Sequence, residues 1–253
     1  MKTLFLNQLE IHPDWKFFLT EDMVKLIDQI EKEIKPNSFT PSKEKVLRFF
    51  NLPLKSSKVI ILGQDPYPQS GIATGRAFEV GNLKSWNKPF KNISLKNILR
   101  VIYKSYTGKV IKYNDLKQKL DNEFPVLSPD KLFEHWEKQG VLLLNTSFTC
   151  EIGKPASHKT IWERFTFLLL NFINEEVPEI TWFLWGNHAR EATKHLTLKH
   201  AIITQHPMMC YEGASRENDF LFGQINCFEK LQNDIDWTGF GLKKNFKQSG
   251  LLF

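Results

Sequence analysis

The stretch from Lys58 to Pro68, which reads KVIILGQDPYP, most constrains how this chain folds. Its first part is an unbroken aliphatic run, typical of a strand that is buried on both faces of a parallel sheet. The run stops at Gly63, and two prolines stiffen the segment that follows. We therefore expect Asp65 to lie on a rigid loop at the carboxyl end of a central strand, where open α/β sheets bind their ligands. Taken alone, an Asp-Pro pair more often makes only a local turn.

Further apolar runs and helical patterns alternate along the rest of the chain. We expect buried strands at 141–144, 180–185 and 200–204, and a shorter strand near 77–80. Apolar residues recur at helical spacing in the segments between them, and the predicted helices cover 21–35, 41–50, 94–103, 131–139, 160–173, 188–195 and 222–232. This alternation predicts an α/β fold, a three-layer α/β/α sandwich around a central, mainly parallel four-stranded sheet, in one domain spanning residues 1–253.

Composition limits the class of protein. Hydrophobic content of 42% and charged content of 25% are ordinary for a globular chain of 253 residues. No apolar run is long enough to span a membrane, and the N-terminal apolar core is too short for a signal peptide, so we expect a cytoplasmic protein, or one in a nuclear or viral compartment with access to DNA. Three widely spaced cysteines predict no metal site. The net charge of +6 fits a polyanionic partner.

Three polar residues each come just after a predicted buried strand: Asp65, Asn145 and His206. Because parallel strands point the same way, we expect these side chains to gather at one edge of the sheet. A carboxylate and a hydrogen-bond donor suit cleavage of the bond between a base and its deoxyribose, in which the sugar becomes cationic and the base leaves with electrons. An amide can donate and accept together, which fits the edge of uracil and mismatches cytosine. Phe78 is the aromatic ring expected to stack on a flipped base.

The motifs around these residues resemble those of the uracil-DNA glycosylases, in particular the family 1-like branch. The stretch from Lys58 to Tyr67 fits the family signature at every position, and GRAF at 75–78, LLLNT at 142–146 and HP at 206–207 follow in family order. The resemblance runs from about residue 40 to residue 238. It implies a hydrolase that removes uracil from DNA in base excision repair and leaves an abasic site, needs no cofactor, and acts as a monomer on single- or double-stranded DNA.

The resemblance also implies a role for each matching residue. Asp65 would position water and stabilise the sugar cation, and His206, acting neutral, would donate a hydrogen bond to the departing uracil. Tyr67 would exclude thymine by closing off the 5-position, and Gln64 would contact the base, partly through its backbone. Phe78 and Asn145 would stack on the base and read its edge. Each of these residues, taken singly, is more often a core or turn residue.

The chain departs from the family pattern at several positions. Pro68 stands where a His is usual, Ile72 where a Gln is usual, and Arg76 where an aliphatic residue is usual. Relatives carry His-Pro-Ser-Pro-Leu-Ser at the last motif, in which serines grip phosphates and the Leu wedges into the gap left by the flipped base. Here the longer segment after 206–207 begins Met-Met-Cys-Tyr, whereas Ser94 matches another phosphate-binding serine.

The divergent loop leaves the contacts to DNA open. Met208, Met209 and Tyr211 are the residues expected to contact DNA there, because apolar side chains can wedge between base steps, and the sequence does not choose among them. The alternative is a rigid cover that never touches DNA. Two other functions compete with uracil release: a glycosylase of the same fold that acts on another modified pyrimidine, for instance in defence against phage, and a non-catalytic module that binds DNA or protein. Tyr67 and Asn145 argue against the first, and Asp65 with His206 against the second.

Overall fold

The computed structural model describes residues 3–34, 38–213 and 216–242. The residues form two compact units, Met1–Asn82 with Gly140–Ile202 and Leu83–Gln139 with Ile203–Phe253, which are described in turn. Among the described residues, no helix is both long and apolar enough to cross a membrane.

The main sheet has four strands in the order β3-β2-β5-β6, and it confirms the predicted α/β class. The strand bounds are β2 Val59–Gly63, β3 Val141–Asn145, β5 Thr181–Trp185 and β6 His200–Thr204. Strand β2 pairs in parallel with both β3 and β5, so it is flanked on both sides. Every residue of β2 and β3 is buried, as the unbroken aliphatic runs predict. In this register the last residues of the two strands, Gly63 and Asn145, lie side by side.

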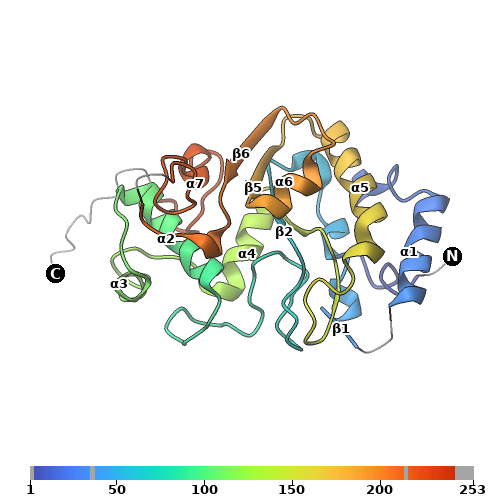
Figure 1. The fold of residues 1–253 in the computed structure, drawn as a ribbon, viewed down its shortest axis with the longest axis horizontal. Helices are drawn as coiled ribbons and strands as arrows, with labels where there is room; N and C mark the ends of the chain where they lie inside the picture. Colours follow the sequence, from blue (N-terminus) through green and yellow to red (C-terminus); the bar gives the residue numbers. More distant parts are fainter. Residues whose placement is uncertain (1–2, 35–37, 214–215, 243–253) are drawn as a thin grey trace. The chain divides into compact units, whose positions relative to one another are not determined.

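In the first unit, the helices α1 Glu21–Glu33 and α5 Lys159–Glu176 lie side by side (Figure 1). Thr20 begins α1 by accepting a hydrogen bond from the backbone N–H of Met23, which satisfies an otherwise unpaired helix donor. Aromatic side chains fill the core of this unit, and Trp15 and Trp162 are fully buried in it. Helix α6, Asn187–Thr193, follows β5 directly, and a two-stranded antiparallel sheet joins β1 Phe39–Thr40 to β4 Cys150–Glu151.

The second unit is largely helical. Its helices are α2 Ile93–Thr107, α3 Tyr113–Lys117, α4 Pro129–Lys138 and α7 Cys227–Lys230, and α2 packs against α3, α7 and the short 3₁₀ segment η5, Pro207–Met209. The rings of Trp136 and Trp237 meet edge to face in its core, with centroids 5.6 Å apart. Gly108 ends α2 in the left-handed conformation, with φ of +71°, which favours glycine.

Several predicted local elements are wrong. In place of the helix predicted over 41–50, the structure has two separate 3₁₀ segments, Lys43–Lys45 and Arg48–Asn51, because the backbone of Leu47 leaves helical geometry between them. Two further short 3₁₀ segments are Pro13–Trp15 and Leu54–Ser56. The strand expected near 77–80 does not form, because Phe78 has φ of +66° and interrupts extended backbone.

Two predicted helix starts are also wrong, and one predicted helix is too long. Helix α2 begins one residue before Ser94, with Asn92 at its N-cap, and α5 begins at Lys159, so Thr160 makes no capping box. The last helix covers only Cys227–Lys230, where Asn226 accepts a hydrogen bond from the backbone of Glu229. The predicted end of the first helix at Pro36 lies outside the described residues, and α1 itself ends at Glu33.

Candidate active site

The ends of β2 and β3 create the space that holds the Asn145 amide. Asn145 is 6% exposed, and its side chain lies directly over Gly63. A methyl group added at Gly63 would overlap the Asn145 side-chain oxygen and would lie 3.0 Å from the Ala77 side chain. Only a residue without a side chain leaves room for the Asn145 amide at this edge of the sheet.

The backbone carbonyl of Gln64 is fixed by two donors from the neighbouring strand end. It accepts hydrogen bonds from the Ser147 N–H at 2.9 Å and from the Thr146 hydroxyl at 3.0 Å. Because C=O and N–H point in opposite directions in a trans peptide, fixing this carbonyl also fixes the direction of the Asp65 N–H. The Gln64 side chain itself is exposed, so the backbone is the ordered part of this residue.

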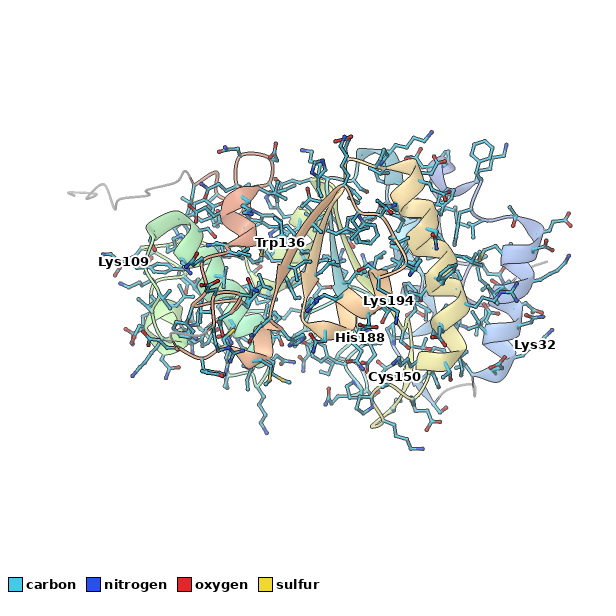
Figure 2. The ribbon with its side chains drawn as sticks, turned by 45° about the horizontal axis from the view of Figure 1, so that its top comes forward. Lys32, Lys109, Trp136, Cys150, His188 and Lys194 are labelled. Carbon is cyan, nitrogen blue, oxygen red and sulfur yellow. The ribbon has the colours of Figure 1, made fainter. Side chains whose placement is uncertain are left out.

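A histidine extends this network away from the loop. The Thr146 hydroxyl has one hydrogen, which it gives to Gln64, so its 2.6 Å contact with His188 is a hydrogen bond donated by the imidazole Nε2. His188 and Thr146 also line a cavity of about 450 Å³ between α5 and α6, together with Phe167, His195 and several charged residues. Figure 2 labels two residues that line this cavity, His188 in α6 and Lys194 just beyond its end.

Asp65 lies half-buried, two residues beyond β2. One of its carboxylate oxygens accepts the backbone N–H of Ala156 at 3.0 Å. Burial raises the pKa of Asp65, because the charged form loses hydration, whereas the Ala156 N–H favours the carboxylate and opposes that shift. The buried thiol of Cys150 donates to the carbonyl of Pro66 at 3.4 Å, and burial raises the pKa of that thiol to about 12. Cys150 therefore stays protonated and serves to hold the loop that carries Asp65.

Tyr67 and Phe78 lie together in the same unit. The Tyr67 hydroxyl donates to the backbone carbonyl of Phe78 at 3.4 Å, and the Phe78 ring lies 5.2 Å from that of Trp185, measured between centroids. Phe78 is only partly buried, as expected for a ring that has a face to offer a ligand. The preceding residue is anchored to the sheet, because the Ala77 N–H donates to the carbonyl of Leu143 at 3.2 Å.

Backbone strain concentrates at this site. Among the described residues, the non-glycine residues with positive φ are Phe78, at +66°, and Ala156, at +60°. One carries the predicted stacking ring, and the other supplies the hydrogen bond to Asp65. Such conformations cost roughly 1–3 kcal/mol each and persist where surrounding contacts enforce them, most often at functional sites.

His206 belongs to the second unit, where its backbone begins η5. Its ring nitrogen Nδ1 accepts the backbone N–H of Met208 at 3.1 Å, and the neutral imidazole therefore carries its hydrogen on Nε2. Burial lowers the pKa of His206, because the cationic form loses hydration. The carbonyl of the adjacent Pro207 accepts a 2.7 Å hydrogen bond from the Asn97 amide of α2, so a helix holds the His-Pro segment. The arrangement gives a neutral ring with Nε2 as the donor.

The divergent loop after η5 is organised around a buried carboxylate. Asp219 is fully buried and accepts backbone hydrogen bonds from Tyr211, Leu221 and Phe222 at 2.9–3.1 Å. The Arg216 guanidinium lies 3.6 Å from Asp219 and 3.7 Å from the Tyr211 ring centroid. The three apolar side chains predicted to contact DNA are nevertheless exposed: Met208 by 56%, Met209 by 56% and Tyr211 by 59%. Ser94, the second residue of α2, is half-buried.

Comparison with known proteins identifies the family of this site. The model of the uracil DNA glycosylase superfamily matches residues 49–228. The chain belongs to this superfamily. A uracil-DNA glycosylase of Borreliella burgdorferi is 37% identical over 215 residues, which cover 79% of this chain and 85% of the relative. One of Borrelia turicatae is 35% identical over 248 residues and covers 90% of this chain and 97% of the relative.

Solved structures agree with that assignment. The mimivirus UNG Y322L variant in complex with UGI has a TM-score of 0.63 at 26% identity, and the match covers 82% of this chain and 73% of that one. The wild-type UNG from Nitratifractor salsuginis has a TM-score of 0.65 at 23% identity, with 81% and 87% covered, and shows the shared fold.

Four residues of this uracil-DNA glycosylase site were not found from the sequence: Ala156, Thr146, His188 and Cys150. Ala156 and Thr146 bind the loop through a backbone N–H and a hydroxyl, neither of which leaves a recognisable motif. Thr146 follows Asn145 within the LLLNT stretch at 142–146. That position in the motif is the one sequence signal that points to Thr146. Cys150 and Ala156 lie more than 80 residues along the chain from the loop residues they contact, and His188 reaches the loop only through Thr146.

Replacing Thr146 by Val tests the network that orients the Gln64 carbonyl. The change keeps the shape of the side chain but removes the hydroxyl, so the loop loses one hydrogen bond and the contact between Thr146 and His188 is lost. We expect kcat/KM for uracil release to fall roughly tenfold, the value of one such bond. Thr193→Val is the matched control, because that buried hydroxyl binds only carbonyls within α6 among the contacts described, and it should leave kcat/KM unchanged. Equal activity of the two variants would contradict the role given to Thr146.

Proposed function

We propose that this chain is a monomeric glycosylase that hydrolyses the N-glycosidic bond of uracil in DNA, with Asp65 and His206 as its catalytic residues. The observation that carries the proposal is the placement of Asp65 and Asn145 at the ends of two paired parallel strands, within a chain that matches the superfamily over 49–228. The products are free uracil and an abasic site, as in base excision repair. The enzyme works in a compartment with access to DNA, the cytoplasm in a bacterial cell.

Asp65 acts on the sugar side of the bond. As the base departs, the deoxyribose gains oxocarbenium-like positive charge, and a fixed carboxylate both stabilises that charge and orients the attacking water. The Ala156 N–H favours the ionised form of Asp65 that this role requires. No bond to the enzyme forms. Water adds to the anomeric carbon and gives a proton to the Asp65 carboxylate, while the glycosidic bond breaks and its electron pair leaves with uracil.

His206 acts on the base side. Negative charge builds on the uracil oxygens as the bond breaks, and a neutral imidazole that donates from Nε2 stabilises that charge. The Met208 N–H at Nδ1 and the lowered pKa support this form of the ring. A cationic ring would already attract the uracil oxygens in the ground state. It would therefore stabilise the ground state and the transition state more equally and lower the barrier less.

The remaining residues recognise the flipped base. Phe78 stacks on it, Tyr67 closes off its 5-position, and Asn145 pairs with the uracil edge through donor and acceptor together. The backbone beside Gln64 adds a fixed donor, the Asp65 N–H. This set favours uracil over thymine, which carries a 5-methyl group, and over cytosine, whose edge reverses the hydrogen-bonding pattern.

A cleavage assay tests the proposed function directly. Oligonucleotides that contain uracil, thymine or a modified cytosine are incubated with the protein, and abasic sites are then cleaved and counted. We expect cleavage at uracil alone. Cleavage at a modified cytosine in place of uracil would favour the rival substrate, and binding without any cleavage would favour a non-catalytic module.

The exposed loop side chains should matter for duplex DNA alone. We propose that Met208, Met209 and Tyr211 contact DNA and fill the gap left by the flipped base, with Ser94 binding a phosphate. A single strand has no stack to hold open, so alanine at the wedging position should lower uracil release from duplex roughly tenfold and leave single-strand release unchanged. Phe17→Ala, which truncates a side chain that is 75% exposed, is the control. If alanine at all three positions leaves the ratio of duplex to single-strand rates unchanged, the loop is a cover and not a wedge.

A further inference from the structure

The turn that carries Phe78 is bridged by a buried ion pair. Arg76 and Glu79 lie on either side of the left-handed Phe78, and their side chains are only 8% and 5% exposed. One guanidinium nitrogen of Arg76 donates to both carboxylate oxygens of Glu79, at 3.2 and 3.0 Å. The pair therefore spans the one residue of this turn whose backbone is strained.

Neighbouring bonds fix both ends of the bridged turn. The Arg76 N–H donates to the Thr74 hydroxyl at 3.2 Å, and the Ala77 N–H donates to Leu143 of β3. Beyond Glu79, the Gly81 N–H donates to the carbonyl of Ile72 at 2.8 Å. Both ends of the turn are thus tied to the fold, and the pair bridges the short segment between them, which carries the Phe78 ring.

Stability alone does not account for a pair of this kind. Removing two charges from water costs as much as their attraction returns, and well-packed apolar residues of similar size are often equally stabilising. What an ion pair adds is direction, because a charge-assisted hydrogen bond is strongest where the donating nitrogen lies close to the carboxylate oxygens, as one Arg76 nitrogen does with both oxygens of Glu79. The Arg76–Glu79 pair therefore fixes the geometry of this turn by charge.

We propose that Arg76 and Glu79 are positioning residues that hold the Phe78 ring in the orientation needed to stack on the flipped base. The proposal rests on the proposed function of Phe78 and extends it to two residues that do not touch the base. The pair acts on binding of the uracil and not on the bond-breaking step. Its loss should therefore raise KM and leave kcat nearly intact.

The test replaces both partners together, because either single change leaves a buried charge that can prevent folding. In Arg76→Met/Glu79→Leu the turn keeps its volume without the directed pair. We expect the thermal midpoint to stay near that of the native protein, while KM for a single-stranded uracil oligonucleotide rises roughly tenfold and kcat changes little. Arg76→Lys, which keeps the charge but not the planar geometry, should give a smaller rise in KM.

Repeating the double substitution in a Phe78→Ala variant separates an effect on the position of the Phe78 ring from a general loss of structure. If the pair acts through the ring, the double substitution should raise KM no further once the ring is gone. An additive rise, or an unchanged KM in the folded double variant, would overturn the proposal while native uracil release still upholds the proposed function. A native protein that releases no uracil would instead overturn the proposed function, and the positioning role with it.

Discussion

Asp65→Asn is expected to lower kcat for uracil release by roughly 10³-fold or more and to leave the affinity for uracil-containing DNA nearly unchanged. The amide keeps the size of the side chain but cannot stabilise the sugar cation as a charge or accept a proton from water. Single-turnover rates on a uracil oligonucleotide, with binding measured separately, give both quantities. Affinity should survive because the stacking and edge-reading residues are untouched.

A second aspartate provides a matched control. Asp14 is also partly buried in the first unit and also accepts a backbone N–H from a distant residue, that of Lys55 at 2.9 Å. Asp14→Asn should change the free energy of unfolding by about as much as Asp65→Asn does, and it should leave kcat for uracil release unchanged. Full uracil release by Asp65→Asn would show that the water is positioned by some other group.

The sequence predicts those parts of the fold in which the kind of residue alone decides whether a segment forms a buried strand. Continuous aliphatic runs mark β2 and β3, because a strand buried on both faces needs apolar residues at every position. The polar residue that ends such a run then falls at the sheet edge, which is why Asp65 and Asn145 could be placed there. That the chain folds as a single domain stays a prediction.

Contacts made by the backbone are beyond sequence reasoning. The hydrogen bond from Ala156 to Asp65 joins residues 91 positions apart through an N–H that nearly every residue has. The left-handed conformation of Phe78 lies beyond the sequence for a related reason: an aromatic residue in the run Ala77-Phe78-Glu79-Val80 favours a strand, and only the completed turn enforces the rarer geometry.

Gly63 shows how a correct observation can have a different cause. The sequence marks Gly63 as the residue that ends the aliphatic run, where a glycine permits a tight exit from the strand. Its φ is not among the positive values, and the structure instead requires space for the Asn145 amide. A pattern reveals that a glycine is needed, but the atom that would collide with a side chain is known only once β3 lies beside β2.

Gly63→Ala is expected to lower kcat/KM for uracil by about 10²-fold, since the added methyl group displaces the Asn145 amide, for which we propose two hydrogen bonds to the base. The same crowding should lower the free energy of unfolding by about 1–3 kcal/mol. Steady-state rates on a single-stranded uracil oligonucleotide and chemical denaturation measure the two effects.

Two comparisons decide whether the loss comes from Asn145 or from reduced stability. Gly108→Ala should cost roughly 1 kcal/mol, because an alanine is strained at φ of +71°, but its methyl group meets nothing within 4 Å and kcat/KM should hold. Asn145→Ala should have little further effect on kcat/KM once Gly63 is replaced, because the amide is already displaced. If the two losses in kcat/KM multiply in the double variant, Gly63 and Asn145 act separately. The position of the amide then does not depend on the room that Gly63 leaves for it.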